Sequence, residues 1–157
     1  MQFNFLKVHF VCLLILLVSY NVLAQNDTGL VESLINSAEK ARTSNSDSAI
    51  VLAQKAVNQA SGLDDKFLLL KAEHTLGYCY YNRNDFELAL THLQKSLELA
   101  KEQNQELWVA INLNRIGNVY QLRSDFVQAL NSYRNALDIN ERIKDKIQMA
   151  QIGRAQV

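Results

Sequence analysis

Few residues in this chain have a type and spacing suited to metal binding or nucleophilic chemistry. His74 and His92 are eighteen residues apart on different predicted helices, and no Cys or His cluster at ligand spacing lies near either. Cys79 lies in an apolar helical stretch, where cysteine behaves as a small buried hydrophobic side chain. The sequence therefore predicts no metal site.

The acidic residues do not form a catalytic pair either. Asp85 and Asp125 each lie at the start of a predicted helix, where an aspartate binds free backbone amides. The chain has no glycine-rich phosphate loop, no paired carboxylates isolated on an apolar face and no serine at a strand-to-helix turn. We expect no enzymatic activity and no cofactor.

The chain instead contains an internal repeat with a period of 40 residues. Leu76, Gly77, Tyr80, Arg83, Asp85, Phe86, Ala89, Leu90 and Leu97 match Ile116, Gly117, Tyr120, Arg123, Asp125, Phe126, Ala129, Leu130 and Leu137. Nine matches at one offset, in a chain without proline and with helical apolar spacing, predict stacked helical hairpins. Such solenoids usually hold another molecule.

Apolar periodicity places the individual helices and the turns between them. We predict helices over residues 29–43, 46–60, 65–82, 86–101, 105–122 and 126–143, and another that starts near Asp145. The polar residues 44–47 make the first turn and can cap the second helix. The repeats then cover 29–62 (a weaker first one), 65–104, 105–144 and an incomplete unit over 145–157. The predicted fold class is all-α, a right-handed solenoid of about three hairpins plus an unfinished fourth.

Residues 1–24 have the pattern of a signal peptide. Lys7 precedes an apolar run from Phe10 to Val18, and Ala24 supplies the small residue before a cleavage site. The run is shorter than the roughly 18 residues that cross a bilayer. We expect export to a periplasmic or other extracytoplasmic space, with an uncleaved membrane tether as the alternative. Cleavage would leave Cys79 as the one cysteine, so the folded domain over 25–157 has no internal disulfide.

The charge balance excludes polyanionic partners. The whole chain has 16 Lys and Arg residues against 16 Asp and Glu residues, and the two signs are interspersed. Proteins that bind nucleic acid through its phosphates usually carry a basic patch. We therefore expect no nucleic acid partner.

The repeat resembles the tetratricopeptide family, whose unit is a helix, a turn and a second helix. The first-helix motif is LGYCYY over residues 76–81 and IGNVYQ over 116–121, and the second-helix motif is DFELAL over 85–90 and DFVQAL over 125–130. In the first repeat, Ala38 and Ala41 take the places of the glycine and the tyrosine. The 40-residue unit is similar to a longer variant found in exported or sensory bacterial proteins.

The resemblance implies roles for two groups of residues. Close packing of the helices is implied for Gly77, Tyr80, Phe86, Ala89, Gly117, Tyr120, Phe126 and Ala129. A concave partner-binding groove is implied for His74, Tyr78, Tyr81, Asn82, Asn114, Asn118 and Gln121. The family's carboxylate clamp needs several basic residues, and only Arg115 and Lys71 lie near this groove, so a neutral or mixed polar ligand is the expectation. Trp108 is expected to pack between repeats.

The function that this resemblance implies is non-catalytic binding of a protein or peptide by an exported scaffold. The alternative is the sensory input region of a larger membrane signalling protein, such as a histidine kinase or a transcriptional regulator. The helix near Asp145 has no predicted partner, so we expect the chain to be the front of a longer protein. A dimer that covers this open end is the other explanation.

Overall fold

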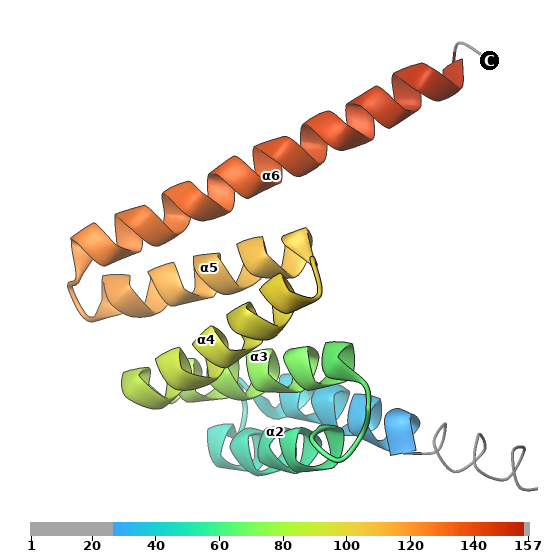
Figure 1. Cartoon of the computed structure of the whole chain (residues 1–157). Coiled ribbons are helices and arrows are strands. Elements are labelled where there is room, and N and C mark those ends of the chain that lie inside the picture. Colours follow the sequence, from blue (N-terminus) through green and yellow to red (C-terminus); the bar gives the residue numbers. More distant parts are fainter. Residues whose placement is uncertain (1–26, 156–157) are drawn as a thin grey trace, which may run out of the picture.

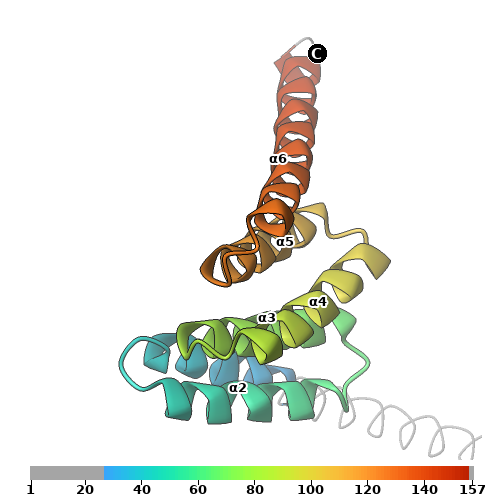
Figure 2. The same cartoon turned by 90° about the vertical axis from the view of Figure 1, so that its left-hand side faces the viewer.

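The computed structural model describes residues 27–155, with side chains up to residue 149. The described chain contains a first helix over residues 27–41, α2 (Ser46–Ala60), α3 (Lys66–Asn82), α4 (Phe86–Glu102), α5 (Glu106–Leu122) and α6 (Phe126–Ala155). Figure 1 shows these helices as successive hairpins, and Figure 2 shows the same stack from the side. No strand occurs among the described residues. The predicted all-α hairpin solenoid is confirmed, whereas the signal peptide over 1–24 lies outside the described residues.

The helix boundaries follow the sequence prediction to within two residues up to residue 126. The prediction of a break before Asp145 is wrong, because α6 is one helix of 30 residues. The sequence over 141–146 has charged residues but no glycine or proline that would end a helix. Arg142 and Lys146, one turn apart, both pair with Glu106 of α5. Figure 1 shows α6 continuing past the end of α5.

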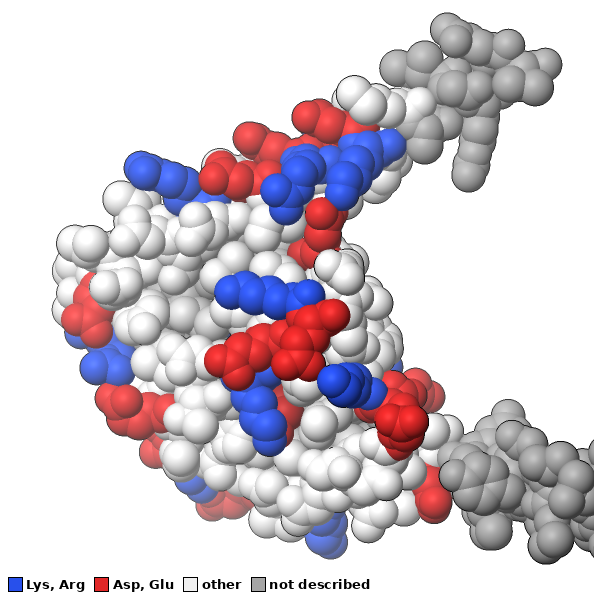
Figure 3. Space-filling view, in the orientation of Figure 1, with Lys and Arg blue, Asp and Glu red and all other residues white. Residues whose placement is uncertain are grey.

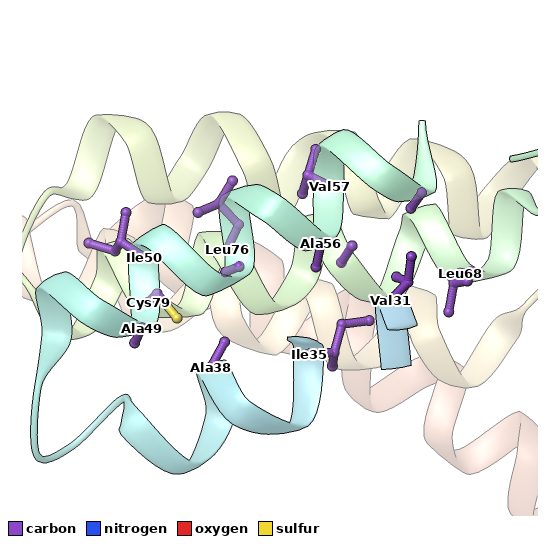
Figure 4. Packing of buried hydrophobic residues seen from close by; sticks show 13 residues of the cluster. Val31, Ile35, Ala38, Ala49, Ile50, Ala56, Val57, Leu68, Leu76 and Cys79 are labelled. Atoms are coloured by element: carbon purple, nitrogen blue, oxygen red, sulfur yellow. The ribbon is translucent and has the colours of Figure 1, made fainter. Parts of the chain in front are cut away.

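Small residues bring the first three helices into close contact. Figure 4 shows the core that these helices share, in which Ala38 of the first helix and Ala49 and Ala56 of α2 are fully buried. Larger side chains such as Ile35 and Leu76 fill the remaining space. Alanine at the contact positions lets helix axes approach closely, and burial of the larger side chains supplies most of the stabilisation. Ala38 therefore packs as the resemblance implied.

Gly77 and Gly117 lie where no side chain fits. A Cβ atom added to Gly77 would lie 2.8 Å from Leu93 Cγ and 3.0 Å from the Leu93 backbone nitrogen. At Gly117 the nearest atom would be Cε1 of the Tyr133 ring, at 2.6 Å. Both glycines therefore mark points of contact between the two helices of a hairpin, as their predicted packing role requires. Ala89, whose carbonyl oxygen would be 3.2 Å from a Gly77 Cβ, completes the first contact.

The helix starts differ in how their free amides are bound. Asn45 and Asp65 cap α2 and α3, with their side-chain oxygens accepting hydrogen bonds from Ser48 N and Leu68 N. The prediction that Asp85 caps α4 in this way is wrong, because its carboxylate makes no such bond and instead pairs with Arg83.

The turn arginines tie each hairpin to the one before it. Arg83 Nη1 lies 3.1 Å from Asp47 at the start of α2, in addition to its pair with Asp85. In the next repeat Arg123 Nη1 lies 2.8 Å from Glu87 at the start of α4, and Arg123 Nε lies 3.4 Å from Asp125. Asp125 therefore also has an arginine partner. We call this repeated arrangement the turn ladder.

The predicted packing role of Phe126 is also corrected. Phe86, its equivalent in the previous repeat, packs with Tyr80 and Tyr120 against buried residues of α4 and α5. Phe126 is mostly exposed, although the neighbouring Ala129 is buried against α5 as predicted. The difference arises because no described helix lies over α6 in the way that α5 lies over α4.

The close contact at Gly77 predicts a cost for any side chain there. We expect Gly77→Ala to lower the free energy of unfolding by about 1–3 kcal/mol, because the added methyl group meets the backbone of α4. Gly117→Ala should cost less, since it displaces the edge of a half-buried tyrosine ring. Urea unfolding followed by circular dichroism measures both values.

Gly29→Ala is the matched control, because nothing lies within 4 Å of a Cβ atom at that helical position. It should leave stability unchanged or raise it slightly. Equal unfolding energies for the Gly77 and Gly29 variants would contradict the close contact.

Candidate functional site

The first helices of the second and third hairpins, α3 and α5, share a row of aromatic side chains. The ring centroids of Phe67 and Trp108 are 6.1 Å apart, and those of Trp108 and His74 are 5.3 Å apart, both edge to face. The row continues along α3 through Tyr78 and Tyr81, whose centroids are 5.7 Å apart. Trp108 of α5 therefore packs against α3, which confirms its predicted role between repeats.

His74 does not line an open surface, so its assignment to the groove is wrong. Its side chain is 8% exposed, and its Nδ1 atom lies 2.9 Å from Asn112 Oδ1 of α5. Asn112 Nδ2 donates to Ser96 Oγ and to the Trp108 carbonyl, and Ser96 Oγ donates to the Leu70 carbonyl. The chain of hydrogen bonds joins α3, α4 and α5 through their buried faces.

This hydrogen-bond network determines which ring nitrogen of His74 carries the proton. Both amide hydrogens of Asn112 have carbonyl or hydroxyl acceptors, so its oxygen must accept from a protonated Nδ1 of His74. Burial lowers the pKa of His74, and the positive charges of Arg115 and Arg42 lower it further, against the opposing effect of the Asn112 bond. His74 is therefore a neutral donor that positions α5 on α3.

Tyr78 lies between two arginine side chains. The Cζ atoms of Arg42 and Arg115 are each 3.9 Å from the centroid of its ring. Two guanidinium groups at that height cannot share one face of the ring, so they cover opposite faces. We call Arg42, Tyr78 and Arg115 the arginine–tyrosine stack, and it joins the turn after the first helix to α3 and α5 in one contact.

The two guanidinium groups have no carboxylate partner among the described residues. Neither Arg42 nor Arg115 takes part in a described ion pair, and Arg42 Nε is buried without a hydrogen-bond partner. A guanidinium that stacks through its face keeps its in-plane N–H groups free to donate. Lys71, the other basic residue expected near the groove, pairs with Glu32 at 3.5 Å.

A shallow pocket lies beside this stack. It has a volume of about 370 Å³ and is lined by Arg42, Thr43, Ser44, Ser46 and Asn82. The predicted site residue Asn82 therefore lines this pocket together with Arg42. Sequence reasoning missed Arg42, because it lies in the turn after the first helix of the weakest repeat and has no matching residue at the 40-residue offset.

The remaining predicted groove residues form a separate polar group at α5. Tyr133 Oη of α6 lies 2.7 Å from Asn118 Oδ1 and 2.9 Å from Gln121 Oε1, so one hydroxyl group joins both side chains. Asn114 is exposed, and Gln121 is also on the surface. Tyr133 stands 40 residues after Leu93, at the equivalent position of the next repeat. This change from an apolar to a hydroxyl-bearing side chain could have indicated a polar contact with α5, and sequence reasoning overlooked it.

The second buried polar cluster is structural. Glu73 is completely buried in α3, with His92 Nδ1 2.7 Å from its Oε2 atom and Lys95 of α4 paired with its Oε1 atom. Burial raises the pKa of Glu73, but the hydrogen bonds and charges of His92 and Lys95 outweigh it, so the pKa is lowered. The cluster binds α4 to α3 within one hairpin.

The described residues 27–149 offer no set of three or more His, Cys, Asp or Glu side chains placed to hold a metal ion. Cys79 is buried, as predicted, and burial raises the pKa of its thiol to about 11. A thiol with that pKa is almost entirely protonated at neutral pH, and its burial also limits access by oxidants. The surroundings of Cys79 are those of a packing residue.

Comparisons with known proteins bear on the fold. No protein-family profile matches the sequence, and no curated protein matches it. Among solved structures, the TPR domain of Arabidopsis FLU superposes with a TM-score of 0.69 at 17% identity, over 74% of this chain and 98% of that one. This chain has the tetratricopeptide fold. At that identity the likeness establishes the arrangement of the helices.

No helix in the described part of the chain is both long and apolar enough to cross a membrane, and this includes the 30-residue α6.

The buried neutral imidazole predicts a loss of stability on acidification. Because the pKa of His74 is lowered in the fold, the unfolded chain binds more protons below pH 6.5, its ordinary value, and the free energy of unfolding falls as pH drops through that range. We expect His74→Gln to make this pH dependence shallower, measured by urea unfolding at several pH values.

Glu73 does not obscure that measurement, because its lowered pKa makes stability fall only below about pH 4.5. A wild-type profile that stays flat from neutral pH to pH 5, or a variant with an equally steep profile, would contradict a neutral buried His74.

Proposed function

We propose that this chain is an exported, non-catalytic scaffold that binds a protein or peptide on the surface of its first helices. The tetratricopeptide fold supports a scaffold, and the arginine–tyrosine stack carries the choice of surface. Rigid helices that already hold their side chains in place lower the ordering cost of binding. The export part of the proposal depends on residues 1–24, whose sequence has the signal-peptide pattern.

The ligand that suits the stack best carries a carboxylate. The two guanidinium carbons are no more than twice 3.9 Å apart, since each lies at that distance from one centroid. At such a separation their repulsion is roughly 2 kcal/mol for an effective dielectric constant of about 20. An anion between the free N–H groups would relieve this repulsion and form charge-assisted hydrogen bonds.

The stack also holds the two charges in position before a ligand arrives. Each cation–π contact is worth about 0.5–1 kcal/mol at a partly exposed site. Asn82 lines the pocket with Arg42, and the ring centroid of Tyr81 is 5.7 Å from that of Tyr78, so amide and hydroxyl groups that suit a peptide backbone lie beside the stack. This proposal replaces the neutral or mixed polar ligand expected from sequence, because Arg42 joins Arg115 in the folded chain.

The remaining charges of the surface do not form a broad basic field. Figure 3 shows Lys and Arg interspersed with Asp and Glu on the face that it presents. Recognition would therefore depend on a local carboxylate contact, and a long polyanion has no continuous track to follow. An acidic side chain or a free carboxyl terminus of a peptide has the required size and charge.

The proposal can be tested with a library of random peptides displayed on phage. We expect the purified chain to select peptides that contain Asp or Glu or end in a free carboxylate. A selected peptide should bind at least tenfold more weakly when its acidic residue is replaced by the corresponding amide. Arg115→Gln and Arg42→Gln should each lower the affinity for the acidic peptide by a similar factor, measured by fluorescence anisotropy.

Lys55→Gln is the matched control, because it removes one exposed positive charge from α2 rather than from a first helix. A double-mutant cycle between the acidic residue and Arg115 should show coupling. Selection of uncharged peptides, or acidic peptides whose affinity survives both arginine substitutions, would contradict the proposed site.

A further inference from the structure

The α6 helix carries an exposed apolar stripe on its outer face. Phe126, Leu130 and Leu137 are 66%, 58% and 56% exposed, and their spacing of four and seven residues places them on one side of the helix. We call these three residues the α6 stripe. Half of the twelve large apolar side chains that are exposed in the described chain belong to α6.

The equivalent positions of α4 are covered by a packed helix. Leu90 is 6% exposed, and Phe86 and Leu97 pack with it against Ile116 and Val119 of α5. The 40-residue repeat gives α6 the same apolar residues at these positions. The α6 stripe therefore has the chemistry of a helix-packing surface, because the residues that form one in α4 recur here in the open.

The start of α6 lacks the acidic residue that α2 and α4 use to bind the following hairpin. In the turn ladder, Asp47 and Glu87 occupy the second position of α2 and α4 and pair with the arginine of the following turn. Val127 occupies that position in α6 and is exposed. A further hairpin of the same design would find no acid for its turn arginine, whereas an apolar partner would gain contact area.

The stripe region is also nearly free of charge. Residues 126–137 contain one charged residue, Arg134, whereas residues 138–146 contain six. Depletion of charge around exposed apolar residues is typical of the buried centre of a protein interface. The partner surface should therefore be apolar and similarly poor in charge.

The opposite end of the solenoid does not provide such a surface. Ser33, Ser37 and Lys40 of the first helix lie 39 residues before Ala72, Leu76 and Cys79, which pack on α2. Ser33, Ser37 and Lys40 are therefore where a preceding helix would pack, and all three are polar and exposed. A head-to-tail assembly would press the α6 stripe onto a lysine, so it does not fit.

We propose that the α6 stripe packs against the α6 stripe of a second copy of this chain. A closed two-fold contact of this kind is self-complementary, because each copy contributes the same apolar surface. An antiparallel arrangement centred on the stripe places Phe126 of each copy near Leu137 of the other. It also separates the two Arg134 side chains by about five residues, or roughly 7.5 Å along the helix, whereas a parallel arrangement would bring them together.

The test is the association state of the purified chain, measured by sedimentation equilibrium over a hundredfold range of concentration. We expect a dimer whose dissociation constant rises at least tenfold in Leu130→Glu, because that change places a carboxylate in the apolar contact. Val127→Glu, which restores the acid found in the other repeats, should weaken the dimer in the same direction. Circular dichroism checks that each variant is folded.

Leu88→Glu is the matched control, since Leu88 is an exposed leucine of α4 outside the stripe. The dissociation constant of its dimer should equal that of the wild type.

The orientation of the two helices can be tested in a Cys12→Ser background, because Cys79 is buried and slow to react. Mixed Phe126→Cys and Leu137→Cys chains should form a disulfide faster than either chain alone. A wild-type monomer at every concentration, or a Leu130→Glu dimer of unchanged strength, would overturn the proposal.

Discussion

The whole arrangement depends on how closely two antiparallel helices approach within a hairpin. At Gly77 the Leu93 side chain and the backbone of α4 occupy the space where a side chain would be, so this contact sets how closely the two helices approach. At Gly117 the same space holds the ring of Tyr133. Both hairpins therefore need a glycine at the helix contact, but different atoms of the second helix lie against it. Because the second hairpin uses an aromatic ring, its hydroxyl group reaches Asn118 and connects α6 to the polar surface of α5.

A second layer of interactions sets how successive hairpins lie on one another. The buried hydrogen bonds from His74 through Asn112 to Ser96 join three helices and leave none of their donors unused. A satisfied polar network in a core specifies one register, because any slip would leave buried groups without partners. Tyr78 lies one turn beyond His74 on α3, so the same register places it between Arg42 and Arg115. The candidate site is in this sense a product of the inter-repeat contact.

The turn ladder and the apolar faces show how one repeated sequence leads to different surfaces. Leu90 and Leu130 are equivalent residues, yet the first is buried by α5 and the second is open to solvent. The acids at positions 47 and 87 give way to Val127 at the corresponding place in α6. These changes convert a repeat-to-repeat contact into an apolar face with little charge. Its chemistry suits a second apolar helix more than a further hairpin.

The sequence alone determined the helices and their pairing, because both depend on local periodicity and on small residues that recur at a fixed spacing. The bounds of α2 and the contact at Gly77 followed from those patterns. Tertiary structure decided what spacing cannot encode, namely which side chains meet across hairpins. It buried His74, brought Arg42 to Tyr78 from a repeat with no matching motif, and carried α6 through residue 145 as one helix. Rotation between neighbouring hairpins governs such contacts, and that rotation arises from the packing of many residues together.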